Sequence, residues 1–271
     1  MTRRRFIADT WSPSTGHPTH AALTGEQAVH LARVLRAQPG QLFDVVANGF
    51  LHRAEVTELR AAGGNEQDSE VLFTLHEELE SDAALPIHLL LAVFKFDRFE
   101  WAIEKVTELG VARITPILAR RTEKHLALAS AKRAERWRRI ALESAKQSRR
   151  SDIPEILDPT PLPTALSREA APTRILLSET EQSLTLASAM SRVPHPSQSY
   201  RDGWDAKKSP ADPPADLALA IGPEGGWTQE EIALFTQHKW TPVTLGPRIL
   251  RAETAAIAAI AIASSHLTTY H

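Results

Sequence analysis

The pattern of apolar positions in the first eighty residues predicts a small unit built mostly from short β-strands. Leu42 to Ala47 and Phe50 to Leu59 are strand candidates, and Asn48-Gly49 between them is typical of a two-residue hairpin, because both turn positions need a positive φ. A further strand is expected at Val71 to Leu75 and a short helix at Gly25 to Leu35. Several short strands with one helix favour a small barrel.

Beyond Ser81 to Pro86, a plausible boundary, strands and helices alternate, which predicts a parallel sheet flanked by helices. The apolar run from Ile87 to Phe94 is the first strand, and a helix is expected from Asp97, with Glu100 completing a capping box and Gly110 ending the element. Residues 191–216 are rich in Ser, Pro and Asp and indicate a mobile loop. Further strands are expected at Arg113 to Leu118, Ile175 to Leu177, Leu217 to Ile221 and Thr241 to Leu245, and further helices at Ala129 to Ser148 and in the alanine-rich C-terminal stretch.

Composition excludes several classes of site. The chain has no cysteine, so disulfides and thiolate metal sites are excluded, and no spacing gathers its 11 histidines into a metal site. The apolar stretch from Ala255 to Ala263 is far shorter than the roughly 20 residues that span a bilayer. No apolar signal-peptide core follows the basic N-terminus. We therefore expect a soluble cytoplasmic protein without a metal.

Positive charge is concentrated in one segment, although the formal net charge of the chain is only -2. From Arg113 to Arg150 the sequence has twelve Lys or Arg and three acids, a local net charge of +9. Such asymmetry indicates a face that binds a polyanion such as RNA. A solvated basic helix, balanced by acids elsewhere in the chain, explains the same count.

Two loops that each join a strand to a helix carry the candidate chemistry. Gly222 to Gly226, GPEGG, precedes a capping box formed by Thr228 and Glu231, and its glycines let the backbone approach a ligand closely. The helix that follows can direct backbone N–H groups at an anion. An ordinary tight turn after a strand would have the same composition.

The second loop, LGPRILRAETA, runs from Leu245 to Ala255. Arg251 and Glu253 lie where the carboxyl edge of a parallel sheet would place polar groups beside a ligand. They could instead only cap the helix or pair with neighbours. The chain lacks the dinucleotide-binding, P-loop and nucleophile-elbow motifs, which argues against a dehydrogenase, a P-loop NTPase and an α/β-hydrolase.

Together these motifs resemble those of the RsmE-type 16S rRNA uridine N3-methyltransferases of the SPOUT class. The resemblance rests on LALAIGPEGGWTQEEI and VTLGPRILRAETAAIAAI, and upstream on FDRFEWAIEKVTELGVARITPI, RWRRIALESAKQSRRSDIPEI and HLARVLRAQPGQLFDV. It covers most of the chain in the same order. Two departures stand out: the connection 191–216 is longer than is usual in the family, and Ser148 to Asp152 lacks an expected glycine.

The resemblance implies an α/β fold with an N-terminal PUA-like β-barrel at residues 1–80 and a SPOUT methyltransferase domain with a C-terminal trefoil knot at residues 85–271. It implies a homodimer that acts on 16S rRNA in the 30S subunit with S-adenosylmethionine as cofactor. The residues that it assigns to the cofactor are Leu177, Ser178, Ile221, Gly222, Pro223, Gly225, Leu245, Gly246, Ile249, Leu250 and Thr254.

For the reaction, we hypothesise that Arg251 stabilises the uridine anion and that Glu253 orients Arg251 or contacts the base. Two alternatives remain: a SPOUT enzyme with another target atom, such as a ribose 2′-hydroxyl or a guanine, and a non-catalytic RNA-binding protein on the same fold. The residues expected to contact RNA phosphates are Arg3, Arg4, Arg5, Arg120, Arg121, Arg136, Arg139, Lys146 and Arg150.

Overall fold

The computed structural model describes residues 5–12, 19–60, 69–79, 84–148, 150–191 and 216–268. Arg3, Arg4 and nearly all of the expected loop 191–216 lie outside these residues. The chain divides into two units, one formed by Met1–Ala83 with Lys146–Asp152, the other by Ala84–Ala145 with Ile153–His271. Each unit has a hydrophobic core of its own.

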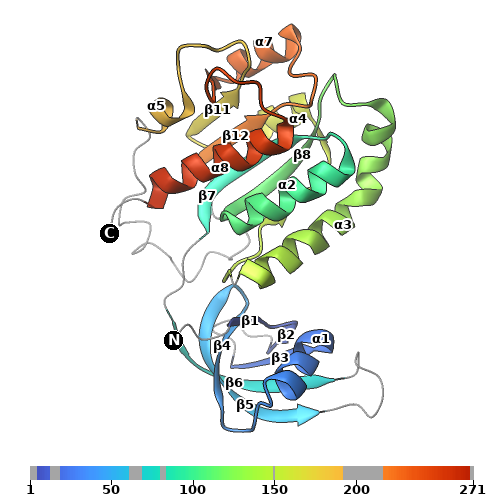
Figure 1. The fold of residues 1–271 in the computed structure, drawn as a ribbon, viewed down its shortest axis with the longest axis vertical. Coiled ribbons are helices and arrows are strands. Elements are labelled where there is room, and N and C mark those ends of the chain that lie inside the picture. Colours follow the sequence, from blue (N-terminus) through green and yellow to red (C-terminus); the bar gives the residue numbers. More distant parts are fainter. Residues whose placement is uncertain are drawn as a thin grey trace. The chain divides into compact units, whose positions relative to one another are not determined.

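The first unit is built on a mixed sheet that curls around a short helix (Figure 1). Its described strands follow the order β1 (Arg5–Ile7), β4 (Leu42–Ala47), β5 (Phe50–Arg60), β6 (Glu70–Glu78), β3 (His20–Thr24) and β2 (Thr10–Trp11). β1 runs parallel to β4, and the other pairs are antiparallel. The helix α1 (Gly25–Val29) continues as one π-helical turn, η1 (His30–Val34), and buries Ala28 and Leu31 against the sheet.

The hairpin expected in this unit is confirmed. Ala47 pairs with Phe50, and the two residues between them, Asn48 and Gly49, have φ values of 52° and 81°. Positive φ at both positions is the backbone condition of a type I′ turn, which matches the twist of the two strands.

The second unit contains a parallel sheet, as the sequence predicts. Over the described ranges its strand order is β10 (Thr160–Pro161), β8 (Val111–Leu118), β7 (Leu85–Ala92), β12 (Leu217–Ile221), β11 (Thr173–Leu177) and β13 (Thr241–Val243), with β9 (Glu155–Ile156) also paired to β8. Every one of these pairings is parallel. The predicted strand Leu217 to Ile221 has the observed bounds, whereas the strand expected to reach Leu245 ends at Val243.

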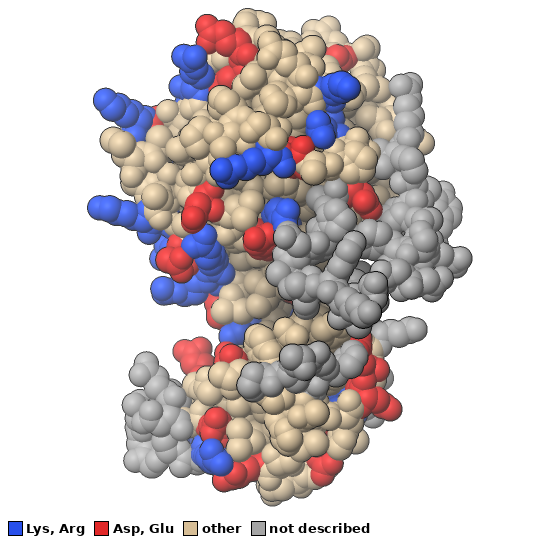
Figure 2. Space-filling model, turned by 180° about the vertical axis from the view of Figure 1, so that it is seen from behind, with Lys and Arg blue, Asp and Glu red and all other residues tan. Residues whose placement is uncertain are grey.

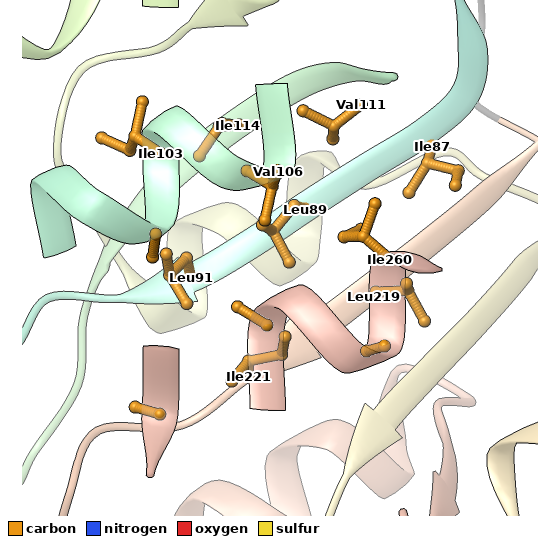
Figure 3. Close-up of a cluster of buried hydrophobic side chains, with 14 of the residues drawn as sticks. Ile87, Leu89, Leu91, Ile103, Val106, Val111, Ile114, Leu219, Ile221 and Ile260 are labelled. Atoms are coloured by element: carbon orange, nitrogen blue, oxygen red, sulfur yellow. The ribbon is translucent and has the colours of Figure 1, made fainter. Parts of the chain in front are cut away.

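Helices cover both faces of this sheet because β7 is apolar on both sides. Leu89 and Leu91 pack against one helical layer, and Leu90 packs against the other. In Figure 3, Ile103 and Val106 of α2 and Ile260 of α8 lie over the first face of β7. That layer contains α2 (Phe96–Glu108), α3 (Lys124–Ser148), α5 (Leu186–Met190) and α8 (Ala252–Thr268), and the opposite layer contains α4 (Leu162–Arg168) and α7 (Gln229–Gln237).

The start of α2 corrects one prediction. The N-cap is Lys95, with no side-chain cap hydrogen bond, so the capping box expected from Asp97 and Glu100 is not formed. Glu100 instead accepts hydrogen bonds from Arg133 and Arg136 of α3, at 3.0 and 2.8 Å. A tertiary ion pair has therefore replaced the local contact that the sequence spacing suggested.

Two other helix ends agree with the sequence. The capping box of α7 is formed, with Thr228 accepting from the Glu231 amide and Glu231 accepting from the Thr228 amide. Gly110 ends α2 with a φ of 97°. No helix in the described ranges is both long enough and apolar enough to pass through a bilayer.

Candidate functional site

The second unit has a cavity of about 1120 Å³ at the carboxyl edge of its parallel sheet. Its walls include Lys95 just beyond β7, Ser178 after β11, Gly222 after β12 and Thr244 after β13. In open α/β sheets, ligands bind at this edge, where loops diverge from neighbouring strands. The volume is that of a small-molecule site rather than of a packing defect.

One wall is the GPEGG loop, which is held against an aromatic stack. A Cβ at Gly222 would come within 3.1 Å of the Trp227 indole, so the loop backbone lies directly on that ring. Trp227 packs edge-on against Phe235 at 4.8 Å between ring centroids, and Phe235 packs against Trp240 at 5.3 Å. The stack ties the loop to the packed face of α7.

Arg121, from the segment after β8, closes the other side of this loop. Its Nη1 donates to the carbonyl oxygen of Gly225 and lies 3.5 Å from that of Trp227. The sequence assigned Arg121 to RNA phosphates, but its guanidinium lines the cavity and binds the GPEGG backbone. The main chain just before it is also held, because the Arg120 amide donates to Glu231 at 2.7 Å.

The opposite wall is the junction between β13 and α8. Gly246 adopts a φ of 115°, and the Thr244 hydroxyl is 3.1 Å from both the Gly246 amide and its carbonyl oxygen. Thr244 also forms an isolated parallel bridge with Thr185. Ile249 lines the cavity with 83% of its surface exposed, so an apolar side chain faces the space without a covering group.

Most residues that the resemblance assigns to the cofactor meet at this cavity. Thr254 is the exception, since it is exposed on the first turn of α8 and does not line the space. The residues that line it are Leu177, Ser178, Ile221, Gly222, Pro223, Gly225, Leu245, Gly246, Ile249 and Leu250.

The two residues expected to act on the acceptor lie in different surroundings. Arg251 is exposed and lines the cavity. The Glu253 side chain is 6% exposed, and its Oε1 lies 3.9 Å from Nε of Arg98. Its Oε2 is buried and accepts no hydrogen bond from the described residues. Within the described residues, the cation that forms an ion pair with Glu253 is therefore on α2 and not in the loop that precedes Glu253.

Sequence reasoning missed two cations at the cavity, Lys95 and Arg98. Nη1 of Arg98 lies 3.0 Å from Oε1 of Glu224 in the GPEGG loop. Both missed residues follow the carboxyl end of β7, so the strand-edge rule that selected the other two loops could also have selected this one. The segment lacks the glycines that drew attention to the others.

A carboxylate at the cavity is held in its charged form. The Ser183 hydroxyl and the backbone N–H groups of Leu184 and Ser183 donate to Glu181 and lower its pKa to about 2. Glu181 therefore stays ionised at any pH at which the protein would be assayed. Opposite charge is also present, since the lining includes Lys95, Arg98, Arg121, Arg248 and Arg251.

The predicted RNA-binding cations differ in how free they are. Arg139 is exposed, whereas Arg136 pairs with Glu100 and Arg120 lies 3.6 Å from Glu230. Figure 2 shows acidic side chains interspersed among the Lys and Arg side chains of one face. In the first unit, Arg5 is half-buried and Lys146 lies 3.6 Å from Asp9. The Arg150 side chain is 8% exposed and pairs with Asp152.

Comparison with known proteins identifies a consistent set of relatives. The family model for the RNA methyltransferase domain matches residues 81–264. The chain is 36% identical over 240 residues to ribosomal RNA small subunit methyltransferase E of Synechocystis, covering 88% of this chain and 71% of the relative. It is 30% identical to the protein of that name from Bacillus subtilis, over 97% and 96% of the two chains.

A solved structure agrees with these sequence matches. The fold is similar, with a TM-score of 0.67 and 28% identity over 96% of both chains, to ribosomal RNA small subunit methyltransferase E of Neisseria gonorrhoeae bound to S-adenosylmethionine.

Proposed function

This chain belongs to the RsmE-type family of small-subunit ribosomal RNA methyltransferases, and on that premise we propose that it methylates N3 of a uridine in 16S rRNA. The reaction would use S-adenosylmethionine and take place in the cytoplasm on the assembled 30S subunit. The observation that carries the proposal is the cavity at the carboxyl edge of the sheet, whose walls are the GPEGG loop and the Leu245 to Leu250 segment.

The residues around the cavity suit this cofactor. The space is large enough for a nucleoside joined to an amino acid, and the exposed Ile249 offers apolar surface to a base. Gly222 and Gly246 bring backbone polar groups to the walls without a side chain in the way. The carboxylate of Glu181 offers opposite charge to a cationic ligand. S-adenosylmethionine would supply a methyl group already activated by a sulfonium.

The chain's own residues must then prepare the acceptor. N3 of uridine carries a proton, and losing it leaves negative charge on the base. Arg251 lines the cavity and is exposed, so its guanidinium is available to stabilise that charge. In this proposal Glu253 does not contact the base. It is buried beside Arg98, and its ion pair with Arg98 holds the start of α8 in place.

We further propose the finer features of the family for this chain: a PUA-like barrel in the first unit, a trefoil knot in the second, and a homodimer. The knot is supported by the course of the last strands. β13 follows β12 in sequence but pairs with β11, and Thr244 then pairs with Thr185 in the connection that leaves β11. The segment after β13 thus lies beside the beginning of the connection between β11 and β12. In a trefoil knot the C-terminal part of the chain passes through the loop that such a connection forms.

The decisive experiment is incubation of the protein with S-adenosylmethionine and unmodified 30S particles, followed by mass spectrometry of the nucleosides. We expect N3-methyluridine. A methylated ribose or guanine would instead support a different target atom. Absence of cofactor binding in calorimetry would support the non-catalytic alternative.

Arg251→Ala tests the role of the guanidinium. We expect single-turnover methylation to slow by about 100-fold, the usual scale for removing one group that stabilises a developing oxyanion. The dissociation constant (Kd) of the cofactor, measured separately, should stay within a few-fold of the wild-type value. Arg168→Ala, which removes an exposed arginine of α4 outside the cavity lining, is the matched control. Unchanged chemistry in Arg251→Ala would exclude the role.

A further inference from the structure

Arg98 connects the two loops that form the walls of the cavity. Its Nη1 lies 3.0 Å from Oε1 of Glu224 in the GPEGG loop, and its Nε lies 3.9 Å from Oε1 of Glu253 at the start of α8. In the described part of the chain, no other side chain forms ion pairs with acids of both loops. One guanidinium on α2 therefore joins segments that follow β12 and β13.

The two contacts differ in their surroundings. The Glu224 side chain is 35% exposed and Arg98 is 33% exposed, so water screens this pair. The Glu253 side chain is 6% exposed, and its Oε2 has no hydrogen-bond partner in the described residues. A buried carboxylate with an incomplete set of hydrogen bonds depends strongly on the nearest cation, because removing that cation leaves a charge with neither water nor a counter-ion.

We propose that Arg98 is a positioning residue that holds the GPEGG loop and the β13–α8 junction at the spacing that the cofactor requires. Its planar guanidinium donates a hydrogen bond to Glu224 through Nη1, while its Nε lies 3.9 Å from Glu253, so the second contact is an ion pair without a hydrogen bond. Loss of Arg98 leaves the Glu253 charge uncompensated, so the first turn of α8 moves toward water and the wall formed by Leu245 to Leu250 moves with it.

This inference rests on the proposed function and adds a positioning role that neither loop motif contains. Arg98 lies outside both GPEGG and LGPRILRAETA, and its partner Glu224 is 126 positions away in the sequence. The pairing exists only because β7 and β12 are neighbours in the sheet, which brings the segments that follow them to the same edge.

The test measures the Kd of S-adenosylmethionine by calorimetry on the full chain. For Arg98→Gln we expect a Kd at least tenfold above the wild-type value. The fall in kcat on 30S particles should be smaller than the rise in Kd, because saturating cofactor returns the wall that carries Arg251 to its place. For Arg98→Lys we expect an intermediate Kd, because an ammonium lacks the fork that spans both acids. The control Arg113→Gln removes an Arg–Glu pair of the same unit away from the cavity and should leave the Kd within twofold.

A double variant shows whether the loss of cofactor affinity comes from the uncompensated charge of Glu253 or from a general loss of folding. Arg98→Gln with Glu253→Gln removes the stranded charge together with its partner, so we expect most of the lost cofactor affinity to return. If Arg98→Gln does not fold, Glu224→Gln tests the same link through its exposed half, with an expected threefold rise in Kd.

A Kd within twofold of wild type in Arg98→Gln, or in Glu224→Gln where that variant replaces it, would overturn the proposal. So would a large fall in kcat with an unchanged Kd, since that result places Arg98 on the RNA. Failure of the wild-type protein to bind the cofactor is a separate outcome, because it removes the proposed function itself.

Discussion

At Gly222 the absence of a side chain shapes the cavity wall. A methyl group there would lie 3.1 Å from the indole of Trp227, and Phe235 packs against the edge of that ring. We expect Gly222→Ala to raise the Kd of S-adenosylmethionine about tenfold and to cost about 1–3 kcal/mol of stability, the usual cost of overpacking. Calorimetry and urea unfolding measure the two effects.

Gly225→Ala is the matched control for that variant. Its new methyl would meet the Cδ of Arg121 at 3.3 Å, and that atom belongs to a flexible side chain that can move aside. We expect a change in Kd below threefold. Equal losses of affinity in the two variants would show that the Trp227 contact does not define the wall.

The ion pair between His88 and Glu169 should make the stability of the protein depend on pH. Nδ1 of His88 lies 2.6 Å from Oε2 of Glu169, and its Nε2 lies 2.7 Å from the Thr115 hydroxyl. Burial alone would raise the pKa of Glu169, but the hydrogen bond and charge of His88, with the Ala171 and Ala170 amides, outweigh it and lower that pKa. A carboxyl group with a lowered pKa stabilises the fold above its unfolded pKa, near 4.5, and loses that effect as pH falls through the folded value.

Glu169→Gln should therefore destabilise the protein by about 2 kcal/mol at pH 7, the typical cost of weakening a buried charged hydrogen bond. Below pH 4.5 its free energy of unfolding should fall less steeply than that of the wild type. Urea unfolding across this pH range measures both. Glu155→Gln, the exposed partner of Arg113, should cost less than about 1 kcal/mol. If the free energy of unfolding changes with pH in the same way for wild type and Glu169→Gln, the lowered pKa of Glu169 does not contribute to stability.

Single residues were predictable where local sequence determines their place. The GPEGG and LGPRILRAETA loops follow apolar strands, and most of their predicted residues line the cavity. Arg98 and Lys95 were missed because their segment lacks the glycines that marked the other two loops, although it too follows the carboxyl end of a strand. That they face the GPEGG loop depends on the pairing of β7 with β12. Arg121 was assigned to RNA on charge alone, and charge does not reveal that its guanidinium binds the Gly225 carbonyl oxygen.

Elements show the same division between local and tertiary causes. The Asn48-Gly49 hairpin and the α7 capping box were predictable because each is complete within four residues. The prediction of a capping box at α2 was wrong, because the Glu100 carboxylate accepts hydrogen bonds from two arginines of α3 and not from a backbone amide. The short edge strands β2, β9 and β10 have only two residues each, too few for any alternation to be read.

In α3, intramolecular pairing separates occupied cations from available ones. Arg133 and Arg136 are held by Glu100, and Arg138 pairs with Glu135 and Asp158. Lys124, Lys132 and Arg139 are exposed and form no ion pair with an acid of the described residues. At 3.6 residues per turn, Lys124, Lys132 and Arg139 lie on one side of the helix, so all three can face the same nucleic-acid backbone.

We therefore expect Arg139→Ala to reduce the slope of log K against log salt concentration by about 0.7 to 0.9, the release of one counter-ion. Binding to 30S particles over a series of salt concentrations measures it. Arg136→Ala is the matched control, since its guanidinium already has a carboxylate partner, and its slope should change by less than half as much. A slope reduced equally by both variants would remove the distinction between paired and free cations.

For the whole molecule, the resemblance implies a barrel followed by a methyltransferase domain, and the cavity lies within one of the two observed units. Every residue that lines the cavity belongs to Ala84–Ala145 or Ile153–His271. A pattern of apolar residues can indicate two such units, because each has its own core. It cannot indicate that β13 pairs with β11 while β12 pairs with β7, since that order arises from contacts between segments that are distant in sequence.

Cofactor binding should accordingly protect one unit only. At a concentration 100 times its Kd, a ligand stabilises the state that binds it by about 2.7 kcal/mol. We expect S-adenosylmethionine to slow amide hydrogen exchange in the segments after β11, β12 and β13, and to leave the β4–β5 hairpin unchanged. Mass spectrometry of peptides measures both, with ATP at the same concentration as a control for non-specific binding of a nucleotide. Equal protection of the hairpin would mean that the first unit takes part in cofactor binding, and the cavity alone would then no longer account for the site.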